Sequence, residues 1–581
     1  MKYLLKIGKP IYKNLLFFVF MYILGTICII VTTERAYAPF YYKLFFELFF
    51  DIYAICILLS ILPNRLRHIA SWVSAGLLYL LAIVDLFCFI RINSTFSPGV
   101  LQLIKETNSQ EATEFISSYI SLDILISPIS IVLLLLFIHI LTCRYCNREF
   151  NIRSNFTSGI ITCLVIIGLI CGLKNKKFII QTWQHHTLGQ VEQFFANNYY
   201  ARRAQYLPIH RFLFAIHANR LTKHEITTLQ HVMEETKIDS CLYTSPNIIL
   251  IIGESYNKHH SQLYGYPYCT TPNQLHRYQN NELYVFSDAV TPFNLTSEVL
   301  KNAFSLNDIT KNEPWCTKPM FTNIFKKCNY HIAFFSNQFV INQQKNMADF
   351  SGGMFLNDSI LSKYQFDIRN QSTHRYDEEL LLDYQMHNKR SHRYQLTIFS
   401  LIGQHTNYTD RFPSSFAKFH PKDYKRKDLS KEQLKIVSDY DNSILYNDYV
   451  VEKIIQEFEQ EESIVIYMAD HGDECYDQIK IFGRQHCDPV TKEVATNEYQ
   501  IPFWIWCSNK YHNSHPNIIQ QIQNSIHRRF YSDDLSHLLI YLGGISNQYY
   551  LDEYNILSPS YNNNRKRLLK KNTDYDMLIK Q

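Results

Sequence analysis

The sequence predicts five membrane-spanning helices followed by an exported α/β domain, whose mostly parallel sheet is covered by helices. Two observations lead to this fold class. Five long apolar runs all lie before residue 175 of the 581-residue chain. After residue 240, short runs rich in Ile, Val, Leu and Phe repeatedly end in polar clusters. The length leaves room for several domains.

Each apolar run approaches the roughly 20 residues that a helix needs to cross the hydrocarbon core of a bilayer. A cleaved signal peptide would explain the first run but not the other four. In a soluble protein, polar faces would interrupt such runs. The runs cover residues 15–33, 44–62, 69–90, 124–141 and 156–173.

Basic residues predict the orientation of these helices. Lys and Arg cluster before the first run, between the second and third, and between the fourth and fifth, which all fall on one side if every run spans. That side is expected to be cytoplasmic, so the long C-terminal portion lies outside. A smaller cluster after the fifth run opposes this with fewer charges. The main clusters contain Lys2, Lys6, Lys9, Lys13, Arg65, Arg67, Arg144, Arg148 and Arg153.

Composition excludes other classes of protein. The 57 Lys and Arg residues nearly balance the 52 Asp and Glu residues, giving a formal charge of +5. No basic tail or aromatic stretch interleaved with Arg and Lys is present, so no nucleic-acid partner is expected. With only 17 Gly and 18 Pro, the chain is not fibrous or of low complexity.

The membrane part carries charged residues with two open interpretations. Lys43, Glu47 and Asp51 recur at helical spacing in the second run, and Asp85 lies in the third. Intramembrane carboxylates often mark a pathway or a substrate site. The alternative is a ladder of salt bridges near the headgroups.

Two segments are too polar to span the membrane. Apolar spacing near 92–122 predicts amphipathic helices on the outer membrane surface. Residues 174–240 are predicted to be connector helices at that surface. The predicted domains are therefore 1–173, a five-helix transmembrane domain that includes the amphipathic segment; 174–240, the connector; and 241–581, the exported catalytic domain.

The strand-like runs of the exported domain predict a shared site. Near-continuous apolar strands are typical of parallel sheets covered on both faces. In such sheets the site lies beyond the carboxyl ends of the strands. Glu254, Asn337, His405, Asp470 and His471 follow such runs and are expected at one edge. The runs are 247–252, 331–335, 396–401 and 463–468.

These side chains suggest metal-assisted phosphoryl chemistry. The imidazole of His471 and the carboxylates of Glu254 and Asp470 suit Zn²⁺. Ser255 and Thr296 are the candidate nucleophiles. Thr296 precedes a helix-like stretch, and a helix N-terminus stabilises a phosphorylated side chain. The alternative is that Thr296 is an ordinary N-cap. A metal would lower the pKa of its hydroxyl enough for attack on phosphorus.

Together these motifs resemble those of bacterial phosphoethanolamine transferases, membrane enzymes of the alkaline phosphatase and sulfatase superfamily. The similarity covers roughly residues 245–560 and extends to the five-helix front end. Its motifs are Gly253-Glu254-Ser255, Ser261 to Tyr266, Thr296 with Phe304-Ser305, Ser336-Asn337-Gln338, Tyr376 to Leu381, Gly403-Gln404-His405, Tyr440 to Ser443, Asp470 to Glu474, and His486.

The resemblance implies roles for individual residues. Glu254, Thr296, Asp470 and His471 match a zinc site in which Thr296 is both ligand and nucleophile. One zinc ion would be tightly bound, and a second is allowed during turnover. The remaining matches are His405 and His486, as substrate-binding or acid/base groups near the phosphoryl group, and the substrate-binding candidates Asn337, Glu106, Thr107 and Glu111. Leu103 stands where some relatives carry Asn.

The implied reaction is a ping-pong transfer. Thr296 attacks phosphatidylethanolamine, releases diacylglycerol and becomes phosphoethanolamine-threonine. An outer-leaflet glycolipid, lipid A or the lipopolysaccharide core, then accepts the group. The protein is expected to be a multi-pass monomer of the bacterial inner membrane, surrounded by lipid, with its sulfatase-like domain in the periplasm.

Three alternatives differ in their sequence requirements. A sulfatase needs Cys or Ser in a C/S-x-P-x-R motif, which this sequence lacks. A phosphoglycerol transferase, or another phosphotransferase or hydrolase of the superfamily, would keep the same motifs and remains open. A non-catalytic membrane scaffold predicts loss of a metal or nucleophile position, yet all of them are present.

Seven cysteines of the exported part would meet an oxidising compartment that permits disulfides. The nearest pairs in sequence are Cys316 with Cys328 and Cys475 with Cys487. Since seven is odd, at least one cysteine is expected to stay unpaired within the domain.

Overall fold

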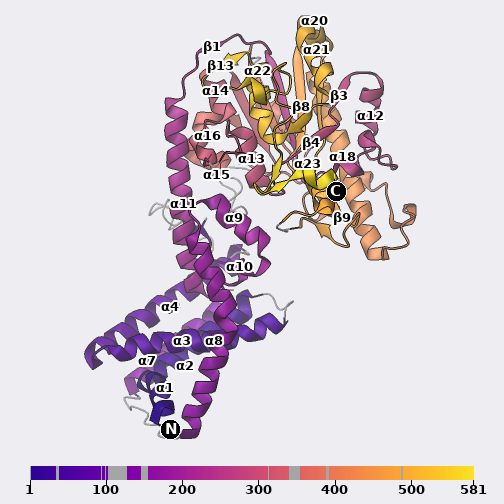
Figure 1. Cartoon of the computed structure of the whole chain (residues 1–581). Coiled ribbons are helices and arrows are strands. Elements are labelled where there is room, and N and C mark those ends of the chain that lie inside the picture. Colours follow the sequence, from indigo (N-terminus) through magenta and orange to yellow (C-terminus); the bar gives the residue numbers. More distant parts are fainter. Residues whose placement is uncertain are drawn as a thin grey trace. The chain divides into compact units, whose positions relative to one another are not determined.

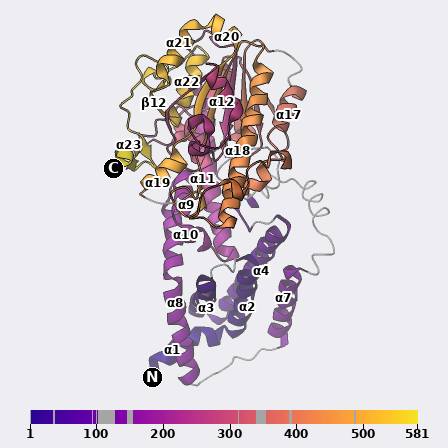
Figure 2. The same ribbon diagram turned by 90° about the vertical axis from the view of Figure 1, so that its right-hand side faces the viewer.

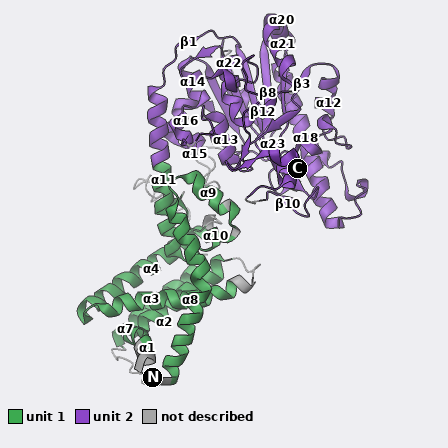
Figure 3. Ribbon diagram, viewed as in Figure 1, with its two compact units in different colours: residues 1–223, 344–350 green, residues 224–343, 351–581 purple. Residues whose placement is uncertain are grey.

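The structure is a computed structural model that describes residues 2–33, 38–92, 95–98, 100–101, 127–145, 155–311, 313–338, 354–387, 392–485 and 489–580. The chain forms two compact units, Met1–Lys223 and His224–Gln343 with Ser351–Gln581 (Figure 3). The division falls inside helix α11 (Pro208–Glu235). The boundaries expected at 173 and 240 stay predictions.

The first unit is helical, and five of its helices are long and apolar enough to cross a membrane (Figure 1). This confirms the five predicted runs. The fifth of these helices continues past the predicted end at 173. Most of the predicted amphipathic segment, with Glu106, Thr107 and Glu111, lies outside the described residues. The helices are α1 (Lys2–Lys13), α2 (Leu15–Thr32), α3 (Ala38–Ile61), α4 (Asn64–Ile92), α7 (Pro128–Tyr145), α8 (Asn155–Gln184), α9 (Leu188–Asn197), α10 (Tyr199–Arg203) and the start of α11.

Two glycines let α3 and α8 approach closely. A Cβ atom at Gly168 would lie 2.3 Å from the carbonyl oxygen of Phe46, and one at Gly172 would lie 3.0 Å from Cγ of Glu47. Small residues spaced four apart commonly bring the backbones of membrane helices together. Larger side chains on this face of α8 would push the two helices apart.

Three carboxylates of the membrane unit are paired inside it. Glu47 and Asp51 lie 2.8 and 2.6 Å from Nζ of Lys176 on α8. Asp85 pairs with Arg211 of α11. These pairs support the salt-bridge interpretation, with cations supplied by other helices.

The second unit is built on a seven-stranded sheet of order β3-β11-β8-β2-β7-β5-β6. The five strands from β8 to β6 run parallel, whereas β11 is antiparallel to β8 and β3 is antiparallel to β11. A mostly parallel sheet was predicted. The strands are β3 (Leu283–Val285), β11 (Phe503–Cys507), β8 (Ser463–Ala469), β2 (Asn247–Gly253), β7 (Gln395–Ser400), β5 (His331–Ser336) and β6 (Ile368–Arg369).

Helices cover both faces of this sheet (Figure 2). Helices α13 (Thr296–Phe304) and α14 (Phe321–Lys327) pack with α22 (Leu535–Leu542), and α12 (Pro272–Gln279) packs with α18 (Lys431–Phe458). The other helices are α15 (Met354–Asn357), α16 (Ser359–Gln365), α17 (Glu379–His387), α19 (Lys492–Val494), α20 (Asn509–Ser514), α21 (Pro516–Ser525) and α23 (Tyr575–Lys580). The small strand pairs are β1 (Ser240–Cys241) with β13 (Ile545–Ser546), β4 (Asp288–Val290) with β12 (Arg529–Tyr531), β9 (Glu474–Cys475) with β10 (Phe482–Gly483), and β14 (Leu568–Leu569) with β15 (Thr573–Asp574).

The register of the central strands aligns their carboxyl ends. Gly253 of β2 pairs with Ala469 of β8, and Ser336 of β5 pairs with Ser400 of β7. Every residue of β2 and β8 is buried. The polar residues that follow these strands therefore begin at one edge, as predicted.

The suggested Cys316–Cys328 disulfide is wrong, because both cysteines are unbridged. Cys316 lies in the turn before α14, and Cys328 is the C-cap residue of α14. Cys487 lies outside the described residues, so the second suggested pair stays a prediction.

Candidate active site

Glu254 follows β2, at a sharp bend in the backbone. Ser255 has φ +56°, a left-handed conformation that is strained for a residue with a side chain. Its Oγ donates a hydrogen bond of 2.7 Å to Oε1 of Glu254. Gly403, in the loop after β7, passes so close that a Cβ atom there would lie 2.9 Å from the carbonyl oxygen of Glu254. The bend and the glycine together bring two strand ends next to each other.

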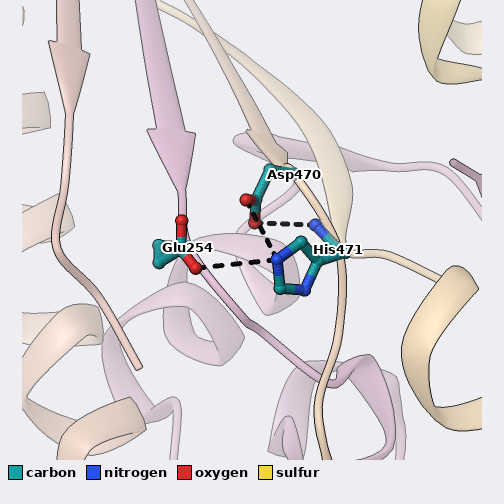
Figure 4. Close-up of side chains that lie close together, drawn as sticks. All are labelled: Glu254, Asp470 and His471. Atoms are coloured by element: carbon teal, nitrogen blue, oxygen red, sulfur yellow. Dashed lines mark hydrogen bonds and ion pairs between the residues drawn. The ribbon is translucent and has the colours of Figure 1, made fainter. Parts of the chain in front are cut away.

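Asp470 and His471 follow β8, the strand next to β2. Oδ1 of Asp470 accepts hydrogen bonds from the backbone N–H of Ser255 at 3.0 Å and of His471 at 2.7 Å. The next residue must be glycine, because a Cβ atom at Gly472 would lie 2.1 Å from the carbonyl oxygen of Asn497. Figure 4 shows the three side chains of Glu254, Asp470 and His471 converging on one point.

The imidazole of His471 has its lone pair directed into the site. Nδ1 lies 2.8 Å from the carbonyl oxygen of Gly472, so Nδ1 is the atom assigned as the donor and Nε2 is left unprotonated. Nε2 lies 3.6 Å from Oε1 of Glu254 and 3.3 Å from Oδ2 of Asp470. Burial, followed by the positive charge of Arg484, lowers the pKa of His471 to about 3. The neutral ring is the form that binds metal ions.

The hydroxyl of Thr296 joins this cluster from a separate segment. Oγ1 donates to Oε2 of Glu254 at 3.0 Å and lies 3.3 Å from Nε2 of His471. Thr296 is the first residue of α13, whose N-cap is Leu295, and no side chain caps this helix. The interpretation of Thr296 as an ordinary N-cap is therefore wrong, because its hydroxyl bonds to the acidic cluster instead.

The cluster fits a metal ion. One ligand atom each from Glu254, Asp470 and His471 lies within 4.8 Å of the others, and all three residues are buried. Oδ2 of Asp470 has no hydrogen-bond partner among the described residues, an unfavourable state for a buried oxygen. Burial and the neighbouring Glu254 raise the pKa of Asp470 well above its ordinary value. A zinc ion suits this set of oxygen and nitrogen donors.

The loop after β5 supports the cluster. Nε2 of Gln338 donates to Oε2 of Glu254 at 3.0 Å and to the carbonyl oxygen of Leu401 at 2.7 Å. Asn337 donates to Asp377 at 2.8 Å and accepts from the backbone N–H of His374 at 2.7 Å. Both ends of the Asn337 amide are thus engaged within the protein, and its role in binding substrate stays a prediction.

His405 lies at the rim of the site, on the loop that follows β7. The carboxylate of Asp377 accepts from the backbone N–H of Ile402 at 2.9 Å and of Gly403 at 3.0 Å, and this fixes the loop. Burial raises the pKa of Glu254, but the side chains of His471, His405 and Arg484 outweigh burial and lower it. The other predicted histidine, His486, lies outside the described residues.

Two further residues beside the site were not predicted. Nη1 of Arg484 lies 3.3 Å from Nε2 of His471. The buried carboxylate of Glu498 accepts from the side chain of Asn294 at 2.6 Å and from the backbone N–H of Gln485 at 2.7 Å. Arg484 could have been predicted from the sequence, because it lies two residues before the candidate His486. Glu498 carries no local signal, because a π-helical turn, Ala495–Tyr499, brings it to the site.

The sequence profile of the sulfatase family matches residues 246–545, which is more than half of the chain. The chain belongs to the sulfatase family. Its sulfatase domain thus coincides with the sheet and with the cluster around Thr296. Membership identifies an enzyme, but it does not specify hydrolysis of sulfate esters, because the C/S-x-P-x-R motif is missing.

Similar proteins share both the sulfatase domain and the helices before it. Phosphoethanolamine transferase EptC of Escherichia coli (strain K12) is 28% identical over 539 residues, covering 89% of this chain and 88% of that protein. Phosphoethanolamine transferase CptA of Salmonella typhimurium is 27% identical over 538 residues, with the same coverage of 89% and 88%.

A solved structure also resembles the sulfatase domain. The crystal structure of the C-terminal periplasmic domain of Escherichia coli EptC, in complex with zinc, is 28% identical in sequence. It covers 59% of this chain and 96% of that chain, with a TM-score of 0.50. That domain was solved with zinc, the ion that the donor set of Glu254, Asp470 and His471 also suits.

Proposed function

We propose that this enzyme transfers phosphoethanolamine from phosphatidylethanolamine to an outer-leaflet glycolipid, either lipid A or the lipopolysaccharide core. The observation that carries the proposal is the hydroxyl of Thr296, 3.0 Å from Oε2 of Glu254 and 3.3 Å from Nε2 of His471. A nucleophile beside a metal-binding cluster at a helix N-terminus is suited to attack on phosphorus. The names of the similar transferases support this choice of group.

Glu254, Thr296, Asp470 and His471 would hold a zinc ion that lowers the pKa of the threonine hydroxyl and neutralises charge on the phosphate. The chain contributes the rest of the chemistry. Glu254 already accepts the hydroxyl hydrogen bond of Thr296, so it is oriented to take the proton. Thr296 is the first residue of α13, so the positive end of the helix dipole would stabilise a phosphoryl group carried by its hydroxyl oxygen.

In the first half-reaction, Oγ1 of Thr296 bonds to phosphorus, and the bond from phosphorus to the glycerol oxygen breaks. Diacylglycerol leaves after its oxygen takes a proton, for which His405 is our candidate donor. Thr296 then carries phosphoethanolamine. The acceptor must therefore recognise the charged phosphoethanolamine group on Thr296, not a free phosphate.

In the second half-reaction, a hydroxyl or phosphate oxygen of the acceptor attacks the same phosphorus. The bond to Oγ1 breaks, Thr296 regains the proton that Glu254 took, and an acceptor hydroxyl gives its own proton to His405. We infer a multi-pass protein of the bacterial inner membrane with its catalytic unit in the periplasm, where donor and acceptor share the outer leaflet. The product gains an ammonium group, which reduces the negative surface charge.

The first test uses purified full-length protein in lipid nanodiscs with fluorescent phosphatidylethanolamine. We expect release of fluorescent diacylglycerol and a mass increase of one phosphoethanolamine on the Thr296 peptide. Fluorescent phosphatidylglycerol serves as the matched donor. Release from phosphatidylglycerol but not from phosphatidylethanolamine would reject the proposed donor in favour of a phosphoglycerol transferase.

The second test identifies the acceptor. Lipid A and core oligosaccharide from cells with and without the protein are compared by mass spectrometry. We expect one additional phosphoethanolamine on one of the two fractions. If neither fraction changes while diacylglycerol is still released, the acceptor assignment is wrong and the donor half of the proposal stands.

A further inference from the structure

Arg484 reaches the site from a β-hairpin, β9–β10, that precedes the candidate His486 in the sequence. Strand β10 pairs with β9, and Gly483 of β10 lies opposite Glu474. Gly483 has φ +81°, which a residue with a side chain would adopt only under strain. The chain turns at this glycine, and Nη1 of the next residue, Arg484, lies 3.3 Å from Nε2 of His471 and 3.5 Å from the carbonyl oxygen of Asn294.

Glu498 ties this arginine to the loop that carries the nucleophile. Its carboxylate binds the side chain of Asn294 at 2.6 Å and the backbone N–H of Gln485 at 2.7 Å. Asn294 also donates to the carbonyl oxygen of Gln485 at 2.8 Å. Asn294 is two residues before Thr296, and Gln485 directly follows Arg484. The three bonds therefore fix the distance between the guanidinium and the threonine loop.

The guanidinium is a cation held among acidic groups. Burial lowers the pKa of Arg484, but Glu254, Asp473, Asp470 and Glu498 outweigh burial and raise it. Nη1 donates to the carbonyl oxygen of Asn294 and to Nε2 of His471, the same atom that a metal ion would use. That nitrogen has a single lone pair, so a bound metal would displace this hydrogen bond and leave a guanidinium N–H available near the threonine hydroxyl.

These contacts predict what the released guanidinium binds. A phosphoryl group in transfer carries negative charge on its non-bridging oxygens. Guanidinium is planar and presents paired N–H donors that match two such oxygens. We propose that Arg484 is a catalytic residue that binds the non-bridging phosphoryl oxygens in both half-reactions, an inference that rests on the proposed function. Glu498 is its positioning residue.

The activity test compares Arg484→Ala with Arg393→Ala. Arg393 is exposed and lies just before β7, at the opposite end of that strand from the site, so its loss removes the same charge without touching the site. We expect diacylglycerol release to fall on the order of 10²–10³-fold in Arg484→Ala and to stay unchanged in Arg393→Ala. Millimolar guanidinium chloride should restore part of the rate of Arg484→Ala. Glu498→Ala should also be slow but should not be rescued, because its arginine is present and misplaced.

A binding test does not depend on turnover. Inorganic phosphate is titrated into zinc-loaded protein by calorimetry, with zinc content checked by mass spectrometry. We expect Arg484→Ala to bind phosphate at least about tenfold more weakly than wild type, at equal zinc content. Arg484→Lys should lie between the two, because it keeps the charge but loses the paired donors.

Phosphate affinity equal to wild type in Arg484→Ala would overturn the proposal, even if the variant were slow. Failure of the proposed function gives a different pattern. Wild type would then release no diacylglycerol from phosphatidylethanolamine, while the phosphate titration would still decide whether Arg484 binds phosphoryl oxygens.

Discussion

Asp85 in the membrane unit and Asp470 in the sulfatase domain are both fully buried carboxylates, yet their surroundings differ. Asp85 pairs with the guanidinium of Arg211 and accepts the backbone N–H of Phe96 at 2.8 Å. Asp470 uses only Oδ1 for hydrogen bonds to the backbone, and Oδ2 has no hydrogen-bond partner among the described residues.

The difference indicates which buried charges serve folding and which serve a ligand. A buried carboxylate with its own internal cation is balanced by the protein, and removing the cation is destabilising. A buried carboxylate that lies next to a second one, and that has an oxygen without a hydrogen-bond partner, is fully balanced only when a ligand binds. The four predictions below follow from this distinction, beginning with the largest expected effect.

Replacing the nucleophile should abolish turnover without unfolding the protein. Thr296→Ala removes the only atom to which phosphorus would bond, so we expect diacylglycerol release to fall on the order of 10⁴-fold or more. The midpoint of thermal unfolding should stay close to wild type, because Oγ1 bonds only within the site. Thr296→Ser is the matched control and should keep a measurable rate. Undiminished release by Thr296→Ala would exclude Thr296 as the nucleophile.

Breaking the pair in the membrane unit should have the opposite signature. Arg211→Leu leaves Asp85 buried and uncompensated, which typically destabilises a protein by about 3–5 kcal/mol. Arg211 also binds the hydroxyl of Thr32 at 2.9 Å, so some of the loss comes from that bond. The measurement is thermal unfolding of purified protein in detergent. The double variant Arg211→Leu/Asp85→Leu should recover much of the loss, and a double variant as unstable as the single one would contradict the pairing argument.

The sequence predicted the architecture because its signals are continuous. An apolar run as long as 15–33 is typical of a helix buried in a membrane. A short apolar run such as 247–252 is typical of a strand in a parallel sheet that helices cover on both faces. The converging polar residues followed from strand order. Glu254 and Asp470 had to share an edge once β2 and β8 were parallel neighbours.

The remaining features depend on distances between segments, which sequence does not encode locally. Arg484 reaches the site through the turn at Gly483, and Glu498 through a π-helical turn. The cysteines nearest in sequence, Cys316 and Cys328, are separated by a helix. The antiparallel strand β11 also carried no distinguishing signal, because its buried residues resemble those of the parallel strands.

Neutralising a carboxylate of the site should stabilise the metal-free protein. Asp470→Asn keeps the acceptor for Ser255 and His471 but removes a carboxyl whose charged form is disfavoured by burial and by Glu254, so we expect the metal-free variant to be about 1 kcal/mol more stable than wild type. Zinc should stabilise wild type by about 4 kcal/mol at a concentration 1,000 times its dissociation constant, and should not stabilise the variant. Thermal unfolding with and without a chelator measures both. A metal-free variant less stable than wild type would show that the carboxyl group of Asp470 stabilises the fold even without a metal ion.

The last prediction asks whether pairing with a cation, rather than location in the membrane unit or in the sulfatase domain, decides whether a buried carboxylate is balanced. His260 is buried in the sulfatase domain between Asp441 and Asp477, with ring nitrogens 2.6 and 3.0 Å from their oxygens. Burial lowers the pKa of His260, but the two carboxylates outweigh it and raise the pKa to about 10. Because the folded pKa lies above the unfolded value of about 6.5, this stabilisation is complete below pH 6.5 and is lost as pH rises towards 10.

We therefore expect His260→Gln to be about 2 kcal/mol less stable than wild type at pH 6, with the gap closing by pH 10. His259→Gln is the matched control. His259 is exposed, and burial of part of its ring lowers its pKa, so its replacement should leave the slope between pH 7 and 10 unchanged. Thermal unfolding across this range measures both variants. A stability difference between wild type and His260→Gln that stays constant with pH would mean that His260 is neutral in the folded protein. Asp441 and Asp477 would then lack the internal cation that Asp85 has in Arg211.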